Sequence, residues 1–259
     1  MSINLRRVLL PALGLLAAVY VAPAFAADDE PPPPPKQDWS FAGPLGTYDR
    51  ASLQRGFQVY KEVCSACHAM SLLSYRNLTA LGFSDAEVKA IAASVEVMDT
   101  EPNDQGEYVE RAGRASDHFK SPFANEQASR AANNGAYPPD LSLITKAREG
   151  AADYVHAILT GYKDAPAGLA VPEGMNYNEY FHGHLIAMPA PLSEGAVTFA
   201  DNTPASVEQM AHDVSTFLTW AAEPEMEARK RLGVKVILFL LLMTGVIYAW
   251  KRKVWADVH

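Results

Sequence analysis

The chain has 259 residues, of which 49% are hydrophobic and 20% charged, and its formal net charge is −8. Residues 27–228 hold 13 Lys and Arg against 29 Asp and Glu, a net charge of −16 that argues against nucleic acid as a partner and favours a basic one. Two cysteines are too few for a disulfide framework, and the sequence contains no Gly-rich phosphate loop and no nucleophile elbow.

The first 26 residues have the pattern of a secretory signal peptide. Arg6 and Arg7 precede a short apolar stretch over 8–21, and residues 24–26 (Ala-Phe-Ala) give the small-x-small pattern of a cleavage site. We therefore expect cleavage near Ala27 and export of the remaining chain. An uncleaved N-terminal membrane anchor is the alternative, which the short apolar stretch disfavours.

A polar leader is expected over residues 27–38. Its five consecutive prolines, residues 31–35, favour polyproline II geometry, and it offers no core-forming residues. From Trp39 onward the composition is that of a globular domain, which we expect to cover residues 39–228.

Four helices are predicted within this domain from apolar residues at helical spacing and from N-terminal capping patterns. They cover residues 50–63, residues 84–95, residues 140–159 with an interruption near Gly150, and a last segment that Thr203-Pro204 opens and whose apolar face continues to Leu218. The segments 98–129 and 161–200 are polar or rich in Gly and Pro, so we expect long loops there. Without a convincing run of alternating strand residues, the predicted fold class is all-α and loop-rich.

The last apolar run, residues 232–250, predicts a single transmembrane helix. A helix of that length spans about 28 Å at roughly 1.5 Å per residue, close to a hydrocarbon core of about 30 Å. Trp250, Trp255 and the basic residues 251–253 lie where interfacial anchors belong. Because the body is expected to be exported, residues 251–259 are expected to form a cytoplasmic tail.

The segment Cys64-Ser65-Ala66-Cys67-His68 has the C-x-x-C-H pattern of c-type haem attachment. Two cysteines three positions apart can form thioethers with the two vinyl groups of one porphyrin, and the adjacent histidine can then ligate the iron. A zinc site would need further soft ligands, and a thioredoxin-like pair would need a βαβ pattern that is missing. We therefore predict one covalent haem c held by Cys64 and Cys67, with His68 as an iron ligand.

The second axial ligand decides what the haem can do. A methionine raises the reduction potential and closes the iron to substrates, which suits electron transfer. Three methionines in loop-like stretches compete for this position, Met98, Met175 and Met188, and Pro189 favours Met188 because it stiffens the loop. A missing or labile ligand would instead give an open, catalytic or sensory iron site, which is the alternative function.

Four stretches carry a further signal: residues 60–68, 130–142, 180–188 and 217–224, the last leading into the C-terminal anchor. With them the sequence resembles the cytochrome c1 family, the membrane-anchored haem subunits of the ubiquinol–cytochrome c oxidoreductase (bc1 complex). The resemblance extends from about Trp39 to Trp250, nearly the whole mature chain, and these stretches together are far more specific than C-x-x-C-H alone.

The resemblance implies roles for single residues. Met188 matches the axial methionine of the family, and Arg130 matches the arginine that pairs with a haem propionate. Pro122 is aligned with a proline whose carbonyl orients the ligating histidine. The chain lacks the extra cysteine pair that some bacterial relatives carry, so we expect packing to hold the loop that this pair staples.

The resemblance also implies a function, that of an electron-carrying subunit rather than an enzyme on its own. It would take single electrons from the Rieske iron–sulfur subunit, pass them to a c-type cytochrome and pack beside cytochrome b. The acidic body fits a basic acceptor, with Glu101, Asp104, Glu107 and Glu110 as a candidate docking cluster. The expected location is the bacterial inner membrane, with the haem domain on the periplasmic side.

Overall fold

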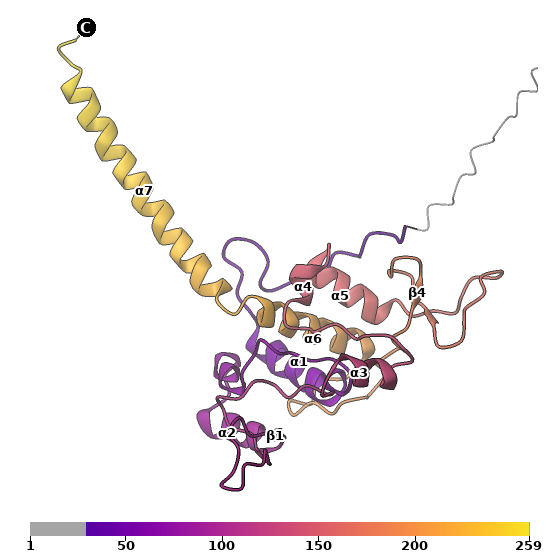
Figure 1. Ribbon diagram of the computed structural model, residues 1–259. Coiled ribbons are helices and arrows are strands. Elements are labelled where there is room, and N and C mark those ends of the chain that lie inside the picture. Colours follow the sequence, from indigo (N-terminus) through magenta and orange to yellow (C-terminus); the bar gives the residue numbers. More distant parts are fainter. Residues whose placement is uncertain (1–29, 259) are drawn as a thin grey trace, which may run out of the picture.

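The computed structural model describes residues 30–258, so the predicted signal peptide, the first residues of the leader and His259 lie outside the described residues. The described chain forms a helical, loop-rich domain from which one long helix, α7 (Met226–Val254), projects (Figure 1). The strands of this part of the chain form two short two-stranded sheets. The predicted all-α, loop-rich class is confirmed, with these two small sheets as additions.

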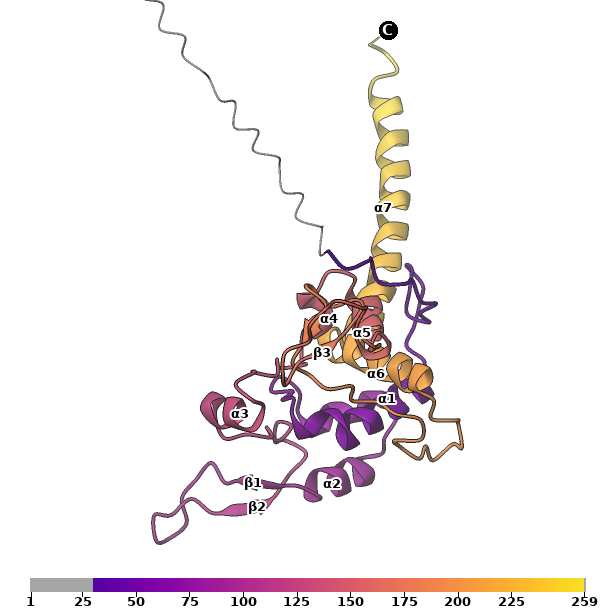
Figure 2. The same cartoon turned by 90° about the vertical axis from the view of Figure 1, so that its right-hand side faces the viewer.

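Two helices, α1 (Arg50–Glu62) and α6 (Val207–Ala222), pack against each other at the centre of the domain (Figure 2). Their apolar faces meet in the core, where Leu53 and Phe217 are fully buried. The backbones approach most closely at Gly56, where a Cβ atom would lie 2.1 Å from the carbonyl oxygen of Asp213. Any larger side chain at this position would therefore push the two helices apart.

A buried carboxylate joins the same two helices. Asp213 on α6 accepts hydrogen bonds from the Ser52 hydroxyl at 2.6 Å and from Nε of Arg55 at 2.7 Å, both on α1. Gln209 donates a further bond at 2.9 Å. Burial by itself would raise the pKa of Asp213, but the nearby His212 ring and the hydrogen bonds from Arg55, Ser52 and Gln209 outweigh it and keep the pKa below its ordinary value.

The predicted helices are present, but two of them begin later than predicted: the segment 140–159 becomes helical only at Ile144, and α6 begins at Val207. Ser84 and Glu87 form the predicted capping box at the start of α2 (Asp85–Ala93). The segment 140–159 is interrupted at Gly150, whose φ of +84° separates α4 (Ile144–Ala147) from α5 (Ala151–Thr160). Thr203-Pro204 does not open α6, because Ser206 lies closer to the first turn and its hydroxyl accepts the N–H of Gln209.

The segments predicted as loops contain small elements of their own. Strand β1 (Glu96–Met98) pairs antiparallel with β2 (Glu110–Ala112), in a hairpin that projects from the domain (Figure 2). Strand β3 (Asn176–Tyr177) pairs antiparallel with β4 (Leu185–Ile186). Strands of two or three residues are too short to give an alternating pattern in the sequence. Short helices complete the loops: η1 (Cys64–Ala66), η2 (Tyr75–Leu81) and α3 (Glu126–Ala132).

The anchor helix α7 is the one candidate membrane span among the described residues, with a mean hydropathy of 2.2 in its most apolar window. Its 29 residues extend beyond the predicted span 232–250 at both ends, because the charged residues on either side also favour a helix. Its first turn is bound to the domain, since Glu227 accepts hydrogen bonds from the backbone N–H of Tyr48 and from Arg50, at 2.8 and 2.7 Å.

Candidate haem-binding site

Helix α1 leads directly into the C-x-x-C-H segment. One residue after α1 ends, η1 begins at Cys64, whose carbonyl accepts the N–H groups of Cys67 at 3.1 Å and His68 at 2.9 Å. The Ser65 hydroxyl donates to the carbonyl of Lys61 at 2.7 Å and so continues the helix end. Both cysteines are free thiols placed within one tight turn, the arrangement that two thioether bonds to one porphyrin require.

The protonation of His68 suits iron ligation. Its Nδ1 atom lies 2.8 Å from the carbonyl oxygen of Pro139. A carbonyl only accepts hydrogen bonds, so Nδ1 carries the hydrogen and the lone pair is on Nε2. Burial lowers the pKa of His68, more than the Pro139 hydrogen bond and the charge of Asp140 raise it, which favours the neutral ring that binds metals.

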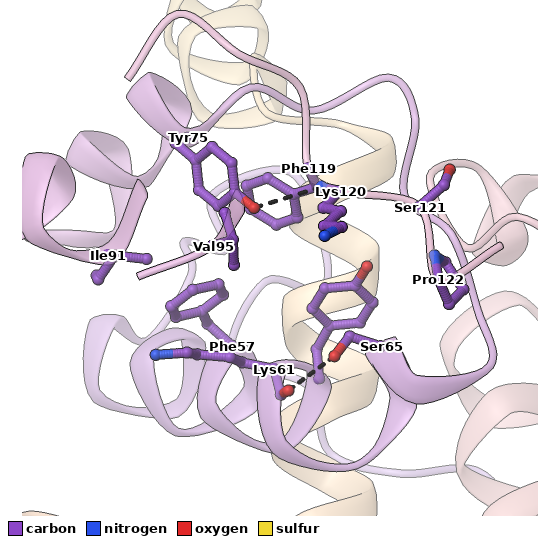
Figure 3. A pocket seen from close by; sticks show the side chains of 11 residues that line it. Phe57, Lys61, Ser65, Tyr75, Ile91, Val95, Phe119, Lys120, Ser121 and Pro122 are labelled. Atoms are coloured by element: carbon purple, nitrogen blue, oxygen red, sulfur yellow. Dashed lines mark hydrogen bonds between the residues drawn. The ribbon is translucent and has the colours of Figure 1, made fainter. Parts of the chain in front are cut away.

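This contact corrects the expected role of Pro122. The carbonyl that orients His68 belongs to Pro139, while Pro122 lines a cavity of about 190 Å³ beside Ser65 (Figure 3). The other walls of this cavity are largely apolar and include Phe57 and Phe119. Both prolines lie near the C-x-x-C-H segment in the folded chain, and the sequence alone does not indicate which of the two carbonyls faces His68.

The Pro139 segment is held beside the motif by three further hydrogen bonds. The N–H of Leu141 donates to the carbonyl of Ala69 at 2.9 Å. The Asp140 carboxylate accepts the N–H of Ser71 at 2.9 Å, and the Ser142 hydroxyl accepts the N–H of Leu72 at 3.1 Å. These bonds link segments about 70 residues apart in the chain. The sequence near His68 therefore does not predict which residue forms its hydrogen bond.

The three candidate methionines lie in two places. Met98, at the end of β1, is 56% exposed. Met175 and Met188 lie at the open end of the β3–β4 hairpin, where both are half-buried. Met70 and Met210, by contrast, are fully buried core residues. The choice among the three loop methionines therefore rests on the family resemblance, which favours Met188.

Arg130 lies on the exposed side of α3. Its guanidinium pairs with Glu126 at 2.8 Å, donates to the carbonyl of Gly135 at 3.0 Å and lies over the ring of Tyr137. With 47% of its side chain exposed, it has the surroundings of a solvated helix-end charge. Its pairing with a haem propionate stays a prediction.

The residues present fit a covalent c-type haem: two closely spaced thiols, a neutral imidazole with an available Nε2, and loop methionines. The sequence analysis did not identify three groups that hold the candidate ligands. The carbonyl of Pro139 contacts His68, and the side chains of Tyr162 and Asn176 contact Met188. The latter two donate to the carbonyl of Met188, at 3.0 and 3.3 Å. The stretches 60–68 and 180–188 contain the candidate ligands His68 and Met188, but neither includes Pro139, Tyr162 or Asn176.

Comparisons with known proteins identify the family. Residues 39–258 match the Cytochrome C1 family. The chain is 52% identical over 243 residues to cytochrome b/c1 of Bradyrhizobium diazoefficiens, covering 85% of this chain but only 35% of that longer protein.

Two relatives match over most of both lengths. Cytochrome c1-2, heme protein, mitochondrial, of Solanum tuberosum is 51% identical over 243 residues, which cover 94% of this chain and 93% of that protein. Cytochrome c1 of Rhodospirillum rubrum is 46% identical over 254 residues, covering 92% and 93%. The chain therefore belongs to the cytochrome c1 family, whose members carry one covalently bound haem c and transfer electrons as subunits of the bc1 complex.

Proposed function

We propose that this protein passes single electrons from the Rieske iron–sulfur subunit to a c-type cytochrome, while α7 holds it beside cytochrome b. Haem c supplies a one-electron couple when bound. The observation that carries the proposal is the His68 ring, held by Pro139 in the tautomer that presents Nε2 at the end of a C-x-x-C-H turn. On its own the subunit carries electrons and catalyses no reaction.

The chain's residues divide the work of holding the group. Cys64 and Cys67 would attach it covalently, and His68 and Met188 would be the two protein ligands of its iron. With both ligands supplied by the protein, the iron would be closed to peroxide and gases, and little would reorganise when an electron passes. Arg130 would supply the counter-charge for a propionate, which would otherwise be costly to bury.

The β1–β2 hairpin supports a basic acceptor. It exposes Glu101, Asp104, Glu107 and Glu110. Its only basic residue, Arg111, is engaged by Asp117 at 2.6 Å and by Asp99 at 3.2 Å. The acids at the tip therefore stay uncompensated, and a basic c-type cytochrome would be attracted to them in a salt-sensitive encounter.

The proposed location is the bacterial inner membrane, with the haem domain in the periplasm and residues 251–259 in the cytoplasm. A predicted signal peptide followed by a single apolar helix supports this orientation, because an exported body ends at its stop-transfer segment. Basic residues at both ends of α7 leave the signal peptide as the deciding feature.

The axial ligand is tested by optical spectra of the purified protein, oxidised and reduced, for the natural protein and for Met188→Leu. The natural protein should show the weak long-wavelength band of a methionine–ferric iron bond and should not bind carbon monoxide after reduction. Met188→Leu should lose the band and bind carbon monoxide. Met175→Leu is the matched control, because Met175 is also half-buried at the open end of the same hairpin.

If the natural protein binds carbon monoxide readily, the iron is open and the catalytic or sensory alternative replaces the electron relay. If instead Met175→Leu loses the band and Met188→Leu keeps it, the relay stands with a different ligand.

The docking surface is tested by stopped-flow reduction of a basic c-type cytochrome at several salt concentrations. Glu107→Lys should slow the reaction several-fold at low salt and flatten its salt dependence. Glu149→Lys, the same charge reversal at an exposed residue outside the hairpin, serves as the control. Equal slowing by both variants would show that net charge, rather than the hairpin, guides the encounter.

A further inference from the structure

The main-chain carbonyl of Met188 accepts two side-chain hydrogen bonds. The Tyr162 hydroxyl donates at 3.0 Å and Nδ2 of Asn176 donates at 3.3 Å. The donors lie 26 and 12 residues from Met188 in the chain, so they reach it from two different segments. A single carbonyl held from two directions has a fixed orientation.

Both donors are fastened to the end of α5. The Asn178 side chain is fully buried, donates to the carbonyl of Ile158 at 2.8 Å and accepts the N–H of Tyr180 at 3.1 Å. Tyr162 forms an antiparallel bridge with Asn178, and Asn176 precedes it by two residues in the same strand segment. The two side chains that hold Met188 are thus carried by backbone that a core helix keeps in place.

The chemistry of both donors is unambiguous. The Met188 carbonyl has no hydrogen to give, so the Tyr162 hydroxyl is the donor in the hydrogen bond between them. The Asn176 side chain must present its amide nitrogen, since the Met188 carbonyl can only accept.

The consequence for the side chain follows from the backbone. Pro189 restricts Met188 to extended ψ values, so the position of its carbonyl also sets the direction of its Cα–Cβ bond. The peptide N of Pro189 carries no hydrogen, which leaves the carbonyl as the polar group by which this peptide unit can be held. Removing a donor would let the peptide plane, and with it the Met188 side chain, rotate.

We propose that Tyr162 and Asn176 are positioning residues that hold the sulfur of Met188 for iron ligation and thereby keep the reduction potential high. This inference rests on the proposed function, in which Met188 is the axial ligand. Methionine ligation raises the potential of a c-type haem, so a looser methionine lowers it. A tenfold loss of binding to reduced relative to oxidised iron corresponds to a fall of about 59 mV.

The test uses the membrane-anchored holoprotein with Tyr162→Phe, Asn176→Leu and the double variant. Each single substitution keeps the approximate shape and removes the donor. Tyr154→Phe is the matched control, because the Tyr154 hydroxyl is half-buried and makes no hydrogen bond among the described residues. The readouts are the midpoint potential, the long-wavelength band, the rate of carbon monoxide binding after reduction and the thermal midpoint.

Each single variant should lower the potential and weaken the band, and the double variant should do so most and bind carbon monoxide measurably. Potentials of all three variants equal to that of Tyr154→Phe would overturn the inference, even if their thermal midpoints fall. If Tyr162→Phe is not recovered folded, Asn176→Leu decides alone. Loss of the band in Met188→Leu separates the two proposals, because that result supports the ligand whatever the positioning variants show.

Discussion

The two sides of the site are built differently. His68 continues the end of α1, a helix packed on α6 in the core, and its ring is fixed by one hydrogen bond to Pro139. Met188 follows a two-residue strand and is held through its carbonyl by two side chains. From this difference we expect substitutions on the histidine side to cost more stability than substitutions at the side chains that hold the Met188 carbonyl.

Substitutions on the two sides should therefore separate stability from potential. Those that disturb the α1–α6 joint should cost mainly free energy of unfolding. Those that disturb the hairpin of Met188 should cost mainly reduction potential. Three variants test this separation by denaturant unfolding and redox titration, and a fourth, outside both sides, is measured by acid titration.

The largest loss of stability is expected for Asp213→Ala, which leaves the Ser52 hydroxyl and Gln209 without their partner and removes one of the two carboxylates that bind Arg55. Breaking a buried ionic network of this kind costs about 3 kcal/mol or more. The midpoint potential should stay near that of the natural protein. A fall in potential as large as that of Tyr162→Phe would contradict the separation.

Compared with Asp213→Ala, Asn178→Ala is expected to cause a smaller loss of free energy of unfolding and a larger fall in reduction potential. It leaves the carbonyl of Ile158 and the N–H of Tyr180 without their side-chain partner, at a cost of about 2 kcal/mol. Because Asn178 anchors the strand segment that carries Asn176, the long-wavelength band should weaken as well. A variant with an unchanged potential would show that the hairpin holds Met188 without this anchor.

Asp140→Ala should have a smaller effect, since Asp140 is exposed and its hydrogen bonds to the N–H groups of Ser71 and Ser142 are partly replaced by water. We expect a loss of about 1 kcal/mol. The optical band should not change, because Pro139 still holds His68 through its main chain, and the potential should not fall, because the variant removes a negative charge that acts on His68. Loss of histidine ligation in this variant would show that the Pro139 segment depends on Asp140 alone.

The last effect is expected outside both sides, at Asp117 beside the β1–β2 hairpin, and concerns the acid dependence of stability rather than the potential. The hydrogen bond from Arg111 outweighs desolvation and lowers the pKa of Asp117 to about 2. Since an unfolded aspartate titrates near pH 3.9, the contribution of Asp117 is complete above about pH 4 and is lost as the pH falls toward 2. Acid titration of the thermal midpoint should show this loss in the natural protein.

Asp117→Asn should lack that component of the acid dependence, and its potential at neutral pH should equal that of the natural protein. An identical acid profile in both proteins would assign the loss to other carboxylates, of which Asp213 is the first to examine.

Local patterns in the sequence were sufficient for several parts of the molecule. The apolar period of α1, the Ser84–Glu87 capping box and the break at Gly150 all involve residues within a few positions of each other. The C-x-x-C-H segment is likewise contiguous. In each case the physical interaction that stabilises the element lies inside the element, so the pattern and the structure coincide.

Other features were fixed only by the tertiary structure. The carbonyl that orients His68 lies 71 residues away, and it belongs to Pro139 rather than to Pro122. Every residue has a carbonyl, so the sequence carries no mark of the one that is used. Ser206, rather than Thr203, caps α6 for a related reason, since the geometry of the entering chain chooses among several suitable side chains.

The sequence by itself determined the long apolar C-terminal helix, the contiguous C-x-x-C-H segment and the helices that form the core, because helical periodicity and local spacing encode them directly. The tertiary structure decided which groups hold the two candidate iron ligands. Pro139, Tyr162 and Asn176 reach His68 and Met188 across long loops. The free energy of such contacts depends on where distant segments meet, which only the folded chain specifies.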